Sequence, residues 1–363
     1  MSERVHVAGD PRDLRDLVAL VQPVDQGVLQ RAWARLDSLT KPPRSLGRVE
    51  ELAARLAAIQ GTERPAVTGS AIILMAADHG VVVEGVSAYP QSVTAQMLAN
   101  FAAGGAAINQ IARAVGADLF LYDVGVAADT SGLQGVRQAT VSRGTANLRV
   151  TAAMSRAEAM HAILTGAHAA QDAADHGANL IGTGEMGIGN TTSAAALTAA
   201  LIGVEPASVV GPGTGLDADG VRRKVTVVQD ALARTSATPD DPVAVLASVG
   251  GLEIAALCGV ILGAAGRRAC VVIDGFISTA AALVAVALCP AAIGYLVASH
   301  RSAEPGHQVQ LDYLGMEPLL DLGMRLGEGT GAALAMPLVR SACETLTHMA
   351  TFAEAGVAGS VSA

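Results

Sequence analysis

Short apolar runs rich in β-branched residues alternate along most of the chain with longer alanine-rich stretches of helical periodicity. Near-continuous apolar runs are typical of parallel strands that helices cover on both faces. The alternation therefore predicts an α/β fold with a doubly wound, mostly parallel sheet. The predicted strands are residues 71–75, 117–123, 178–181, 268–274 and 291–298. The predicted helices are residues 91–103, 155–176, 190–201, 217–233, 250–265 and 279–288.

The two ends of the chain carry helical periodicity only. Residues 11–60 place an apolar helix face behind Ser45, the predicted N-cap, and residues 328–356 form another long helical pattern. We therefore expect a small helical subdomain formed from both termini and attached to a large α/β domain. The expected division is 1–60 and 328–363 for the small subdomain and 61–327 for the large domain.

One uncharged stretch, residues 275–299, is long enough to cross a bilayer. Pro290 divides it, alanines dominate the part before the proline, and the part after it has the pattern of a strand. We therefore expect a buried helix followed by a buried strand, and no membrane span.

The composition bounds the class of protein. Hydrophobic residues make up 51% of the chain, aromatic residues 2% and charged residues 16%, which excludes a disordered chain and indicates a core of small side chains. The net charge of −9 argues against binding to nucleic acid or an anionic membrane, because either requires a basic face.

The cysteines and the N-terminus favour the cytoplasm. The stretch Met1–Asp16 mixes acidic and basic residues, unlike a signal or transit peptide. No C-x-x-C pair occurs, so we expect reduced, buried thiols and neither a zinc site nor a redox dithiol. We also expect no cofactor. The four cysteines are Cys258, Cys270, Cys289 and Cys343.

A glycine-rich segment, residues 182–189, lies between a predicted strand and a predicted helix that opens at Asn190. Glycines let the backbone approach a phosphate, and a helix N-terminus attracts anions, so we expect an anion site here. A tight turn with Asn190 as a plain N-cap is the simpler interpretation.

The same segment permits a second function. Its first six residues match the dinucleotide pattern G-x-G-x-x-G, which is typical of an NAD(P)-binding oxidoreductase. That interpretation requires a ribose-binding acid about 20 residues further on, at the end of a strand. Glu205 has nearly this spacing but falls in a predicted loop, so a mononucleotide phosphate is favoured.

A second glycine cluster, Gly211-Pro-Gly-Thr-Gly215, precedes a predicted helix that contains Lys224. Lysine is a point-charge partner for phosphate, although a lone lysine is more often a solvated surface residue. No P-loop pattern occurs in the chain.

Two carboxylates accompany the glycine clusters. Glu328 stands between Gly327 and Gly329 at the start of the last long helix. A carboxylate there simply complements the helix dipole, or it serves as a base that the dipole keeps ionised. Glu185 lies inside the first glycine cluster. Two acids beside one anion site are costly unless the substrate is cationic or donates a proton.

Further polar residues collect where predicted strands end, the edge at which doubly wound sheets bind ligands. They include Asp78-His79-Gly80, Asp274 and Ser299-His-Arg-Ser302. A loop and helix after the first strand carry Ser87, Gln96 and Met97, which can border a flat aromatic pocket. Core packing accounts for the methionine equally well.

Taken together, these segments resemble the nicotinate-nucleotide:5,6-dimethylbenzimidazole phosphoribosyltransferase family, which makes the lower-ligand nucleotide of cobalamin. The resemblance runs in order from about residue 25 to residue 356. The matching segments are Leu39-Thr-Lys-Pro-Pro-Arg-Ser-Leu-Gly47, Asp78-His-Gly80 with Gly85-Val-Ser87, Gly184-Glu-Met-Gly-Ile-Gly-Asn-Thr-Thr192, Gly211-Pro-Gly-Thr-Gly215, Ile273-Asp-Gly-Phe-Ile277, Ser299-His-Arg-Ser302 with Glu304-Pro-Gly306, and Gly327-Glu-Gly-Thr-Gly331.

The resemblance implies a transfer of 5-phosphoribose from nicotinate mononucleotide to dimethylbenzimidazole by a homodimer. Because the two rings must lie on opposite faces of C1′, we expect inversion there, and the chain has no metal motif, so we expect no metal. Glu328 would remove the azole proton, and Glu185 would be an accessory carboxylate near the ribose. The residues implied to hold the phosphate and ribose are Gly187, Asn190, Thr191, Lys224, Asp274, Ser302 and Gly327, and those implied to border the base are Ser87, Gln96 and Met97. A catalytically inactive nucleotide-binding protein is a further alternative, in which the glycine loops persist and Glu328 is idle.

Overall fold

The computed structural model describes residues 13–358. The expectation that Met1–Asp16 is neither a signal peptide nor a transit peptide therefore concerns residues that lie almost wholly outside the described range. Within them, no helix is both long and apolar enough to cross a membrane. The four cysteines are buried free thiols, as expected.

Six parallel strands form one sheet in the order β3-β2-β1-β4-β5-β6. The order reverses direction between β1 and β4, and in such sheets ligands bind outside the carboxyl ends of the strands at this switch point. The predicted doubly wound α/β fold is confirmed. The strands are β1 (Ser70–Ala77), β2 (Asp118–Gly125), β3 (Val136–Gln138), β4 (Leu180–Met186), β5 (Cys270–Ile273) and β6 (Leu296–Ala298).

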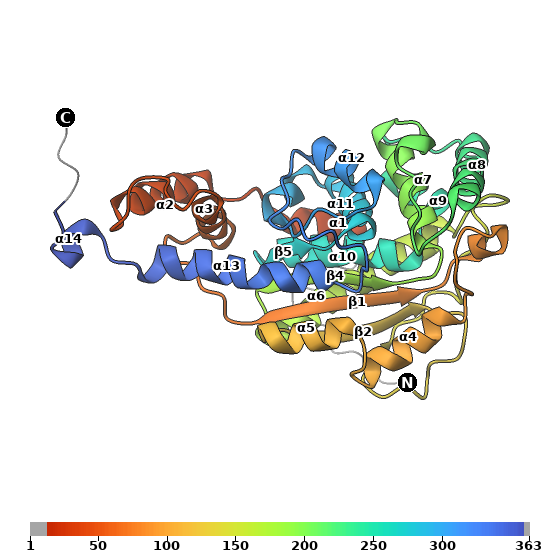
Figure 1. Ribbon diagram of the computed structural model, residues 1–363, viewed down its shortest axis with the longest axis horizontal. Helices are drawn as coiled ribbons and strands as arrows, with labels where there is room; N and C mark the ends of the chain where they lie inside the picture. The colour runs from red at the N-terminus through yellow and green to blue at the C-terminus, as the bar shows by residue number, and fades with distance from the viewer. Residues whose placement is uncertain (1–12, 359–363) are drawn as a thin grey trace.

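Helices cover both faces of the sheet (Figure 1). On one face α10 and α6 pack on each other and on β1, and on the other α13 packs against β4 while α5 packs against β2. The helices are α1 (Leu14–Leu20), α2 (Gln26–Ser38), α3 (Arg48–Gln60), α4 (Val93–Ala102), α5 (Ala107–Val115), α6 (Arg156–Asp175), α7 (Asn190–Ile202), α8 (Ala218–Arg234), α9 (Pro242–Val249), α10 (Leu252–Gly266), α11 (Phe276–Leu288), α12 (Pro305–Leu314), α13 (Thr330–His348) and α14 (Phe352–Ala355).

The helices from the two ends of the chain meet in an arm. Figure 1 shows α13 running from the sheet out to α2 and α3, which project from one end of the molecule, and α3 packs against both α2 and α13. Helix α1 packs instead against α10 and α6. We retain the division at residues 60/61 and 327/328 as a proposal, with α1 packed on the large domain.

Several element boundaries differ from the prediction. Strand β4 continues to Met186, five residues beyond the predicted end, and residues 290–295 form a 3-10 helix, so only 296–298 of the predicted strand pair with β5. Helix α3 begins after Gly47, not after Ser45. Strand β3 and helices α5, α9 and α12 were not predicted.

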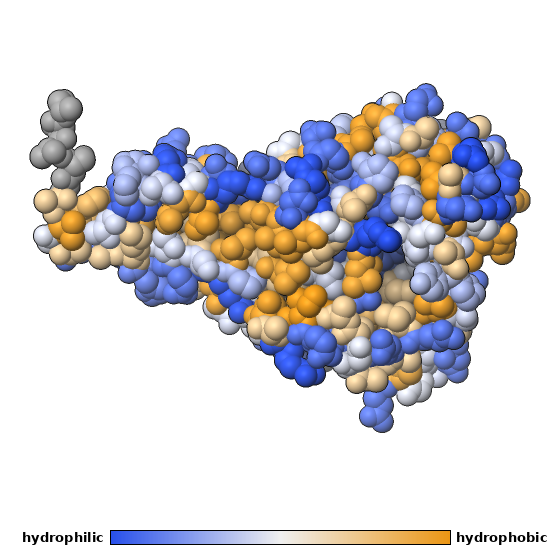
Figure 2. Space-filling view, viewed as in Figure 1, coloured by the Kyte–Doolittle hydropathy of each residue, from blue (hydrophilic) through white to orange (hydrophobic). Residues whose placement is uncertain are grey.

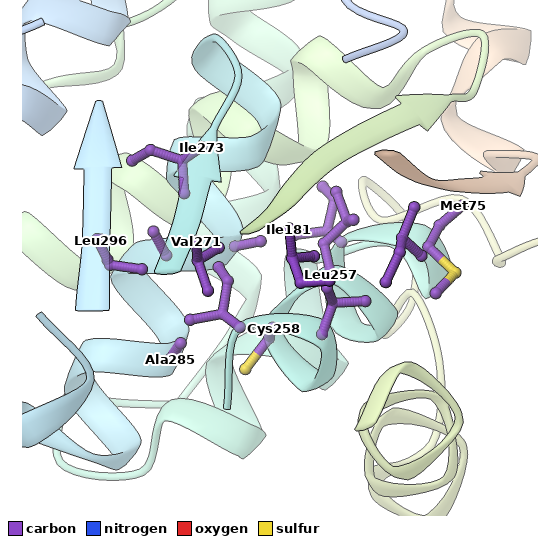
Figure 3. Packing of buried hydrophobic residues seen from close by; sticks show 14 of the residues in the cluster. Met75, Ile181, Leu257, Cys258, Val271, Ile273, Ala285 and Leu296 are labelled. Carbon is purple, nitrogen blue, oxygen red and sulfur yellow. The ribbon is translucent and has the colours of Figure 1, made fainter. Parts of the chain in front are cut away.

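Small residues let α6 and α10 approach until their backbones touch. A Cβ added to Gly166 or Gly259 would overlap the carbonyl group of the facing helix, at Ala256 and Ile163 respectively. On its other side α10 packs beneath the sheet, where Figure 3 shows Leu257 pointing toward Ile181. The alanine-rich and glycine-rich composition is thus what permits this close layering.

Gly259→Ala should lower the free energy of unfolding by about 1–3 kcal/mol, because α6 and α10 must separate to admit the methyl group. Urea unfolding measures the change. Gly132→Ala is the matched control, since a Cβ there meets nothing within 4 Å. Equal stability of the two variants would show that α6 and α10 can separate at this contact without a cost in stability.

Candidate active site

A cavity of about 490 Å³ opens at the carboxyl edge of the sheet, within the range of roughly 300–1,000 Å³ usual for small-molecule sites. Four strand ends meet there: β1 leads to the loop carrying Tyr89, β4 carries Glu185 one residue before its end, β5 leads to Asp274, and β6 leads to His300. Residues that the sequence places at separate strand ends therefore share one wall.

The N-terminus of α7 forms one end of the cavity. Gly187, Asn190 and Thr191 line it, and the N-cap Gly189 has φ = 96°, a left-handed conformation that favours glycine. The free N–H groups of a first helical turn carry partial positive charge. This end of the cavity is suited to an anion.

Lys224 adds a full positive charge beneath the same end. Its side chain is completely buried, and Nζ donates to Oγ1 of Thr191 at 2.7 Å and to the carbonyl of Gly211 at 3.3 Å. Burial lowers the pKa of Lys224 to about 8, against the opposing charge of Glu304. An ammonium group has three donor hydrogens, so one remains for a ligand.

The second glycine cluster passes close to that ammonium group. Gly213 lies over it, and a Cβ there would come within 3.2 Å of Nζ of Lys224. Glu304 accepts the N–H of Gly213 at 2.9 Å, and Arg325 donates to the Gly213 carbonyl at 3.0 Å. Both side chains line the cavity, so they hold the loop that borders the anion end.

Glu328 also lines the cavity and stands in a strained loop. Its φ is 63°, with Gly327 and Gly329 at φ = 84° on either side. A left-handed conformation costs a non-glycine residue about 1–2 kcal/mol, and such strain concentrates at functional sites. Gly184 in β4 admits the loop, because a Cβ there would lie 2.7 Å from the carbonyl oxygen of Glu328.

The carboxylate of Glu328 is buried against the start of α5, where Oε2 accepts the N–H of Ile108 at 3.3 Å. Burial raises the pKa of Glu328, the N–H of Ile108 lowers it, and the charge of Asp274 raises it further. The pKa shift is opposite in direction to the one expected from the dipole of its own helix, because burial dominates, and the N–H that the carboxylate accepts belongs to α5.

Two more carboxyl groups are buried beside Glu328. Burial and the neighbouring charges raise the pKa of Glu185 to about 8, and Asn190 donates its side-chain amide to Oε2 of Glu185. Burial raises the pKa of Asp274 to about 7. Asp274 accepts the N–H groups of Gly329, Gly331 and Ala332 at 2.8 to 3.2 Å, so it caps α13 and anchors the Glu328 loop.

An apolar wall faces the carboxyl groups. It comes from the loop before α4, from α4 and from the start of α11, and it is suited to a flat ring system. Leu326 continues it next to Gly327. The other apolar members are Tyr89, Val93, Met97, Met186, Phe276 and Ile277.

Comparison with known proteins decides the family. The sequence model of a family described as phosphoribosyltransferase matches residues 21–357. A nicotinate-nucleotide–dimethylbenzimidazole phosphoribosyltransferase from Chloroflexus aggregans is 54% identical over 337 residues, 93% of this chain and 96% of the relative. One from Deinococcus radiodurans is 51% identical over 356 residues, 96% and 97% of the two chains. The crystal structure of the enzyme of that name from Thermus thermophilus has a TM-score of 0.88 at 50% identity, covering 93% of this chain and 100% of that chain. The chain belongs to this phosphoribosyltransferase family.

This family membership confirms the resemblance and shows that the protein is an enzyme. The oxidoreductase alternative is wrong, and the structure gives a physical reason. Gly182 and Gly184 belong to β4 and not to a phosphate loop, and they are small so that α13 and its preceding loop can lie against the strand. The alternative of a catalytically inactive nucleotide-binding protein is wrong for the same reason, since the members of the family are enzymes.

In this phosphoribosyltransferase most of the predicted site residues come together. Lys224 stands directly behind the lining. Ser87 is joined to the lining by hydrogen bonds of 3.2 Å with the hydroxyl of Thr214 and from the N–H of Tyr89. Gln96 is exposed on α4 and does not line the cavity. Those that line it are Glu185, Gly187, Asn190, Thr191, Asp274, Ser302, Gly327, Glu328 and Met97.

Three functional groups were not predicted as such. Glu304 and His300 were seen only as parts of the matching segments, and the N–H of Ile108 belongs to a helix that was not predicted. Asn109 carried a signal for that helix, since its side chain accepts the N–H of Ala106 at 3.0 Å in a capping interaction.

Proposed function

We propose that the enzyme transfers the 5-phosphoribosyl group of nicotinate mononucleotide to 5,6-dimethylbenzimidazole, giving nicotinate and α-ribazole 5′-phosphate. The observation that carries the proposal is a single cavity lined both by the N-terminus of α7, with Lys224 behind it, and by the buried carboxyl groups of Glu328 and Glu185. The names of relatives at 50–54% identity over almost the whole chain support these substrates.

The phosphate of the nucleotide binds at the N-terminus of α7. Gly187, Asn190 and Thr191 approach it with backbone and side-chain groups, Lys224 supplies charge from below, and Ser302 stands nearby on the loop after β6. An anchored phosphate fixes C1′ of the ribose in position, which is where much of the rate enhancement of a bimolecular transfer arises.

The leaving group needs no acid. Nicotinate is bonded to C1′ through a positively charged ring nitrogen, and it departs as a neutral pyridine while the ribose becomes oxocarbenium-like. Glu185 and Asp274 lie where that transient positive charge needs support. The incoming ring approaches the opposite face of C1′, so the configuration inverts.

Glu328 acts as the general base. Its raised pKa makes the carboxylate a stronger proton acceptor than a solvated glutamate. It takes the N–H proton of the benzimidazole while the other ring nitrogen attacks C1′. Met97 and its apolar neighbours hold the flat base against the carboxylate.

Purified protein given nicotinate mononucleotide and a panel of bases should convert dimethylbenzimidazole to a product with the mass of ribazole phosphate. Nuclear magnetic resonance should show the α anomer, because in-line displacement inverts C1′. Absence of product with every base would overturn the proposed function, and a β anomer would overturn the displacement mechanism.

We further propose a homodimer, which the resemblance implies. Figure 2 shows apolar residues gathered along α13 and beside the arm, a surface of the kind that a subunit contact buries. A cytoplasmic location also stays a proposal, supported by the four reduced cysteines.

A further inference from the structure

Besides Glu304, which opposes the charge of Lys224, three buried carboxyl groups line the same cavity. Glu185 and Glu328 are 6% exposed and Asp274 is 2% exposed. A fourth, Glu253 of α10, is fully buried beneath the loop after β4, where a Cβ on Gly187 would lie 3.2 Å from its Oε1. Four such charges at close range cannot all stay ionised without compensation.

The cations of the site do not supply that compensation. Lys224 donates to Thr191 and to the Gly211 carbonyl and is opposed by the charge of Glu304. His79 is committed to Glu253, at 2.7 Å. Within residues 13–358, neither Glu185 nor Glu328 forms an ion pair.

The remaining basic groups near the cavity are also engaged or neutral. His300 is 3.8 Å from Asp274, and burial lowers its pKa. Arg325 donates to the Gly213 carbonyl on the loop at the anion end. The carboxyl end of the cavity is thus left with an excess of acids.

The hydrogen bonds indicate which acid keeps a proton. Asp274 accepts three N–H groups from the start of α13, an arrangement that stabilises its ionised form. Glu328 accepts one N–H from α5. Glu185 has only the side-chain amide of Asn190, while Glu253 and Asp274 oppose its ionisation.

Nicotinate mononucleotide, the substrate under the proposed function, brings the compensating charge, because its ring nitrogen at C1′ is positive. We propose that Glu185 is protonated in the ligand-free enzyme and releases its proton to solvent when the cationic ring enters, so that Glu185 selects substrates by charge. The O–H bond of the carboxyl group breaks, and the proton passes to water. The nucleotide product carries a neutral ring, so Glu185 takes a proton back as the product forms, and the charge-matched contact is lost.

Calorimetric titration with nicotinate mononucleotide, in buffers of different ionisation enthalpy, counts the protons released on binding. At pH 7 the wild type should release close to one more proton per bound nucleotide than Glu185→Gln, because a group with a pKa of about 8 is largely protonated there. The phosphate contributes equally in both proteins and cancels. The Kd of the wild type should fall about tenfold more than that of the variant between pH 6 and pH 7.

Two controls test whether the released proton comes from Glu185 and depends on the cationic ring. Ribose 5-phosphate has the phosphate but no cationic ring, so the wild type and Glu185→Gln should release equal numbers of protons with it. Glu253→Gln removes a neighbouring charge and should release fewer protons than the wild type. Proton release that persists in Glu185→Gln, or that ribose 5-phosphate also triggers, would overturn the inference while leaving the proposed function intact. A wild-type protein that binds no nicotinate mononucleotide would overturn the proposed function itself.

Discussion

Glu328→Gln should lower kcat by about 10²–10⁴-fold, the effect expected for removing a general base, while the Kd for nicotinate mononucleotide stays within about twofold. Glutamine has the same shape and its carbonyl oxygen can accept the N–H of Ile108, which Glu328 accepts at 3.3 Å. The strained loop and the cap on α13 are untouched, so the fold should persist. Steady-state rates together with calorimetric binding separate the two quantities.

Glu344→Gln provides the matched control for that experiment. Glu344 is on α13, the helix that follows the Glu328 loop, and its side chain is largely exposed. Its replacement should leave kcat unchanged. A loss smaller than tenfold in Glu328→Gln, with the control at wild-type rate, would remove Glu328 from the role of base.

Lys224→Met should raise the KM for nicotinate mononucleotide by about 100-fold with a smaller change in kcat, because a charge-assisted hydrogen bond contributes about 1.5–3 kcal/mol. Methionine retains most of the buried stem beneath Thr191 but has no donor. Initial rates over a range of nucleotide concentrations give both constants.

Loss of the ammonium group also removes the donor to the Gly211 carbonyl and the positive charge near Glu304. A general loosening of the loop must therefore be distinguished from loss of a phosphate contact. Nicotinate riboside, which lacks the phosphate, makes the distinction. Wild type and Lys224→Met should use it equally well. If the variant is impaired by the same factor on both substrates, Lys224 supports the loop and does not contact the phosphate.

The periodicity of the sequence located five strands of the sheet but neither the edge strand β3 nor the exact strand ends. Apolar runs located β1, β2 and β5 because parallel strands are covered on both faces. The periodicity placed the end of β4 too early, because Gly182 and Gly184 resemble loop residues in a sequence. Only their contacts with α13 and Glu328 show why a strand carries them. Pro290 and the residues after it have strand composition but form a 3-10 helix.

The residues of the site could likewise be predicted only in part from the sequence. Glu328 was found from its flanking glycines, which signal an unusual backbone conformation. Its contact with the N–H of Ile108 joins residues 220 positions apart and has no signature in either segment. Lys224 and Thr191 likewise meet only in the fold. Gln96 had a suitable side chain and a suitable neighbourhood, but α4 turns it to solvent.

The central claim is that Glu328 deprotonates the incoming base next to a ribose whose phosphate Lys224 and α7 anchor. A crystal structure of Glu328→Gln with nicotinate mononucleotide and dimethylbenzimidazole, in which slow turnover preserves both reactants, tests it most directly. We predict that the phosphate lies within hydrogen-bonding distance of Nζ of Lys224, and that the amide of residue 328 lies about 3 Å from the azole N–H. Residue 328 pointing into solvent, or a phosphate bound away from α7, would contradict the claim.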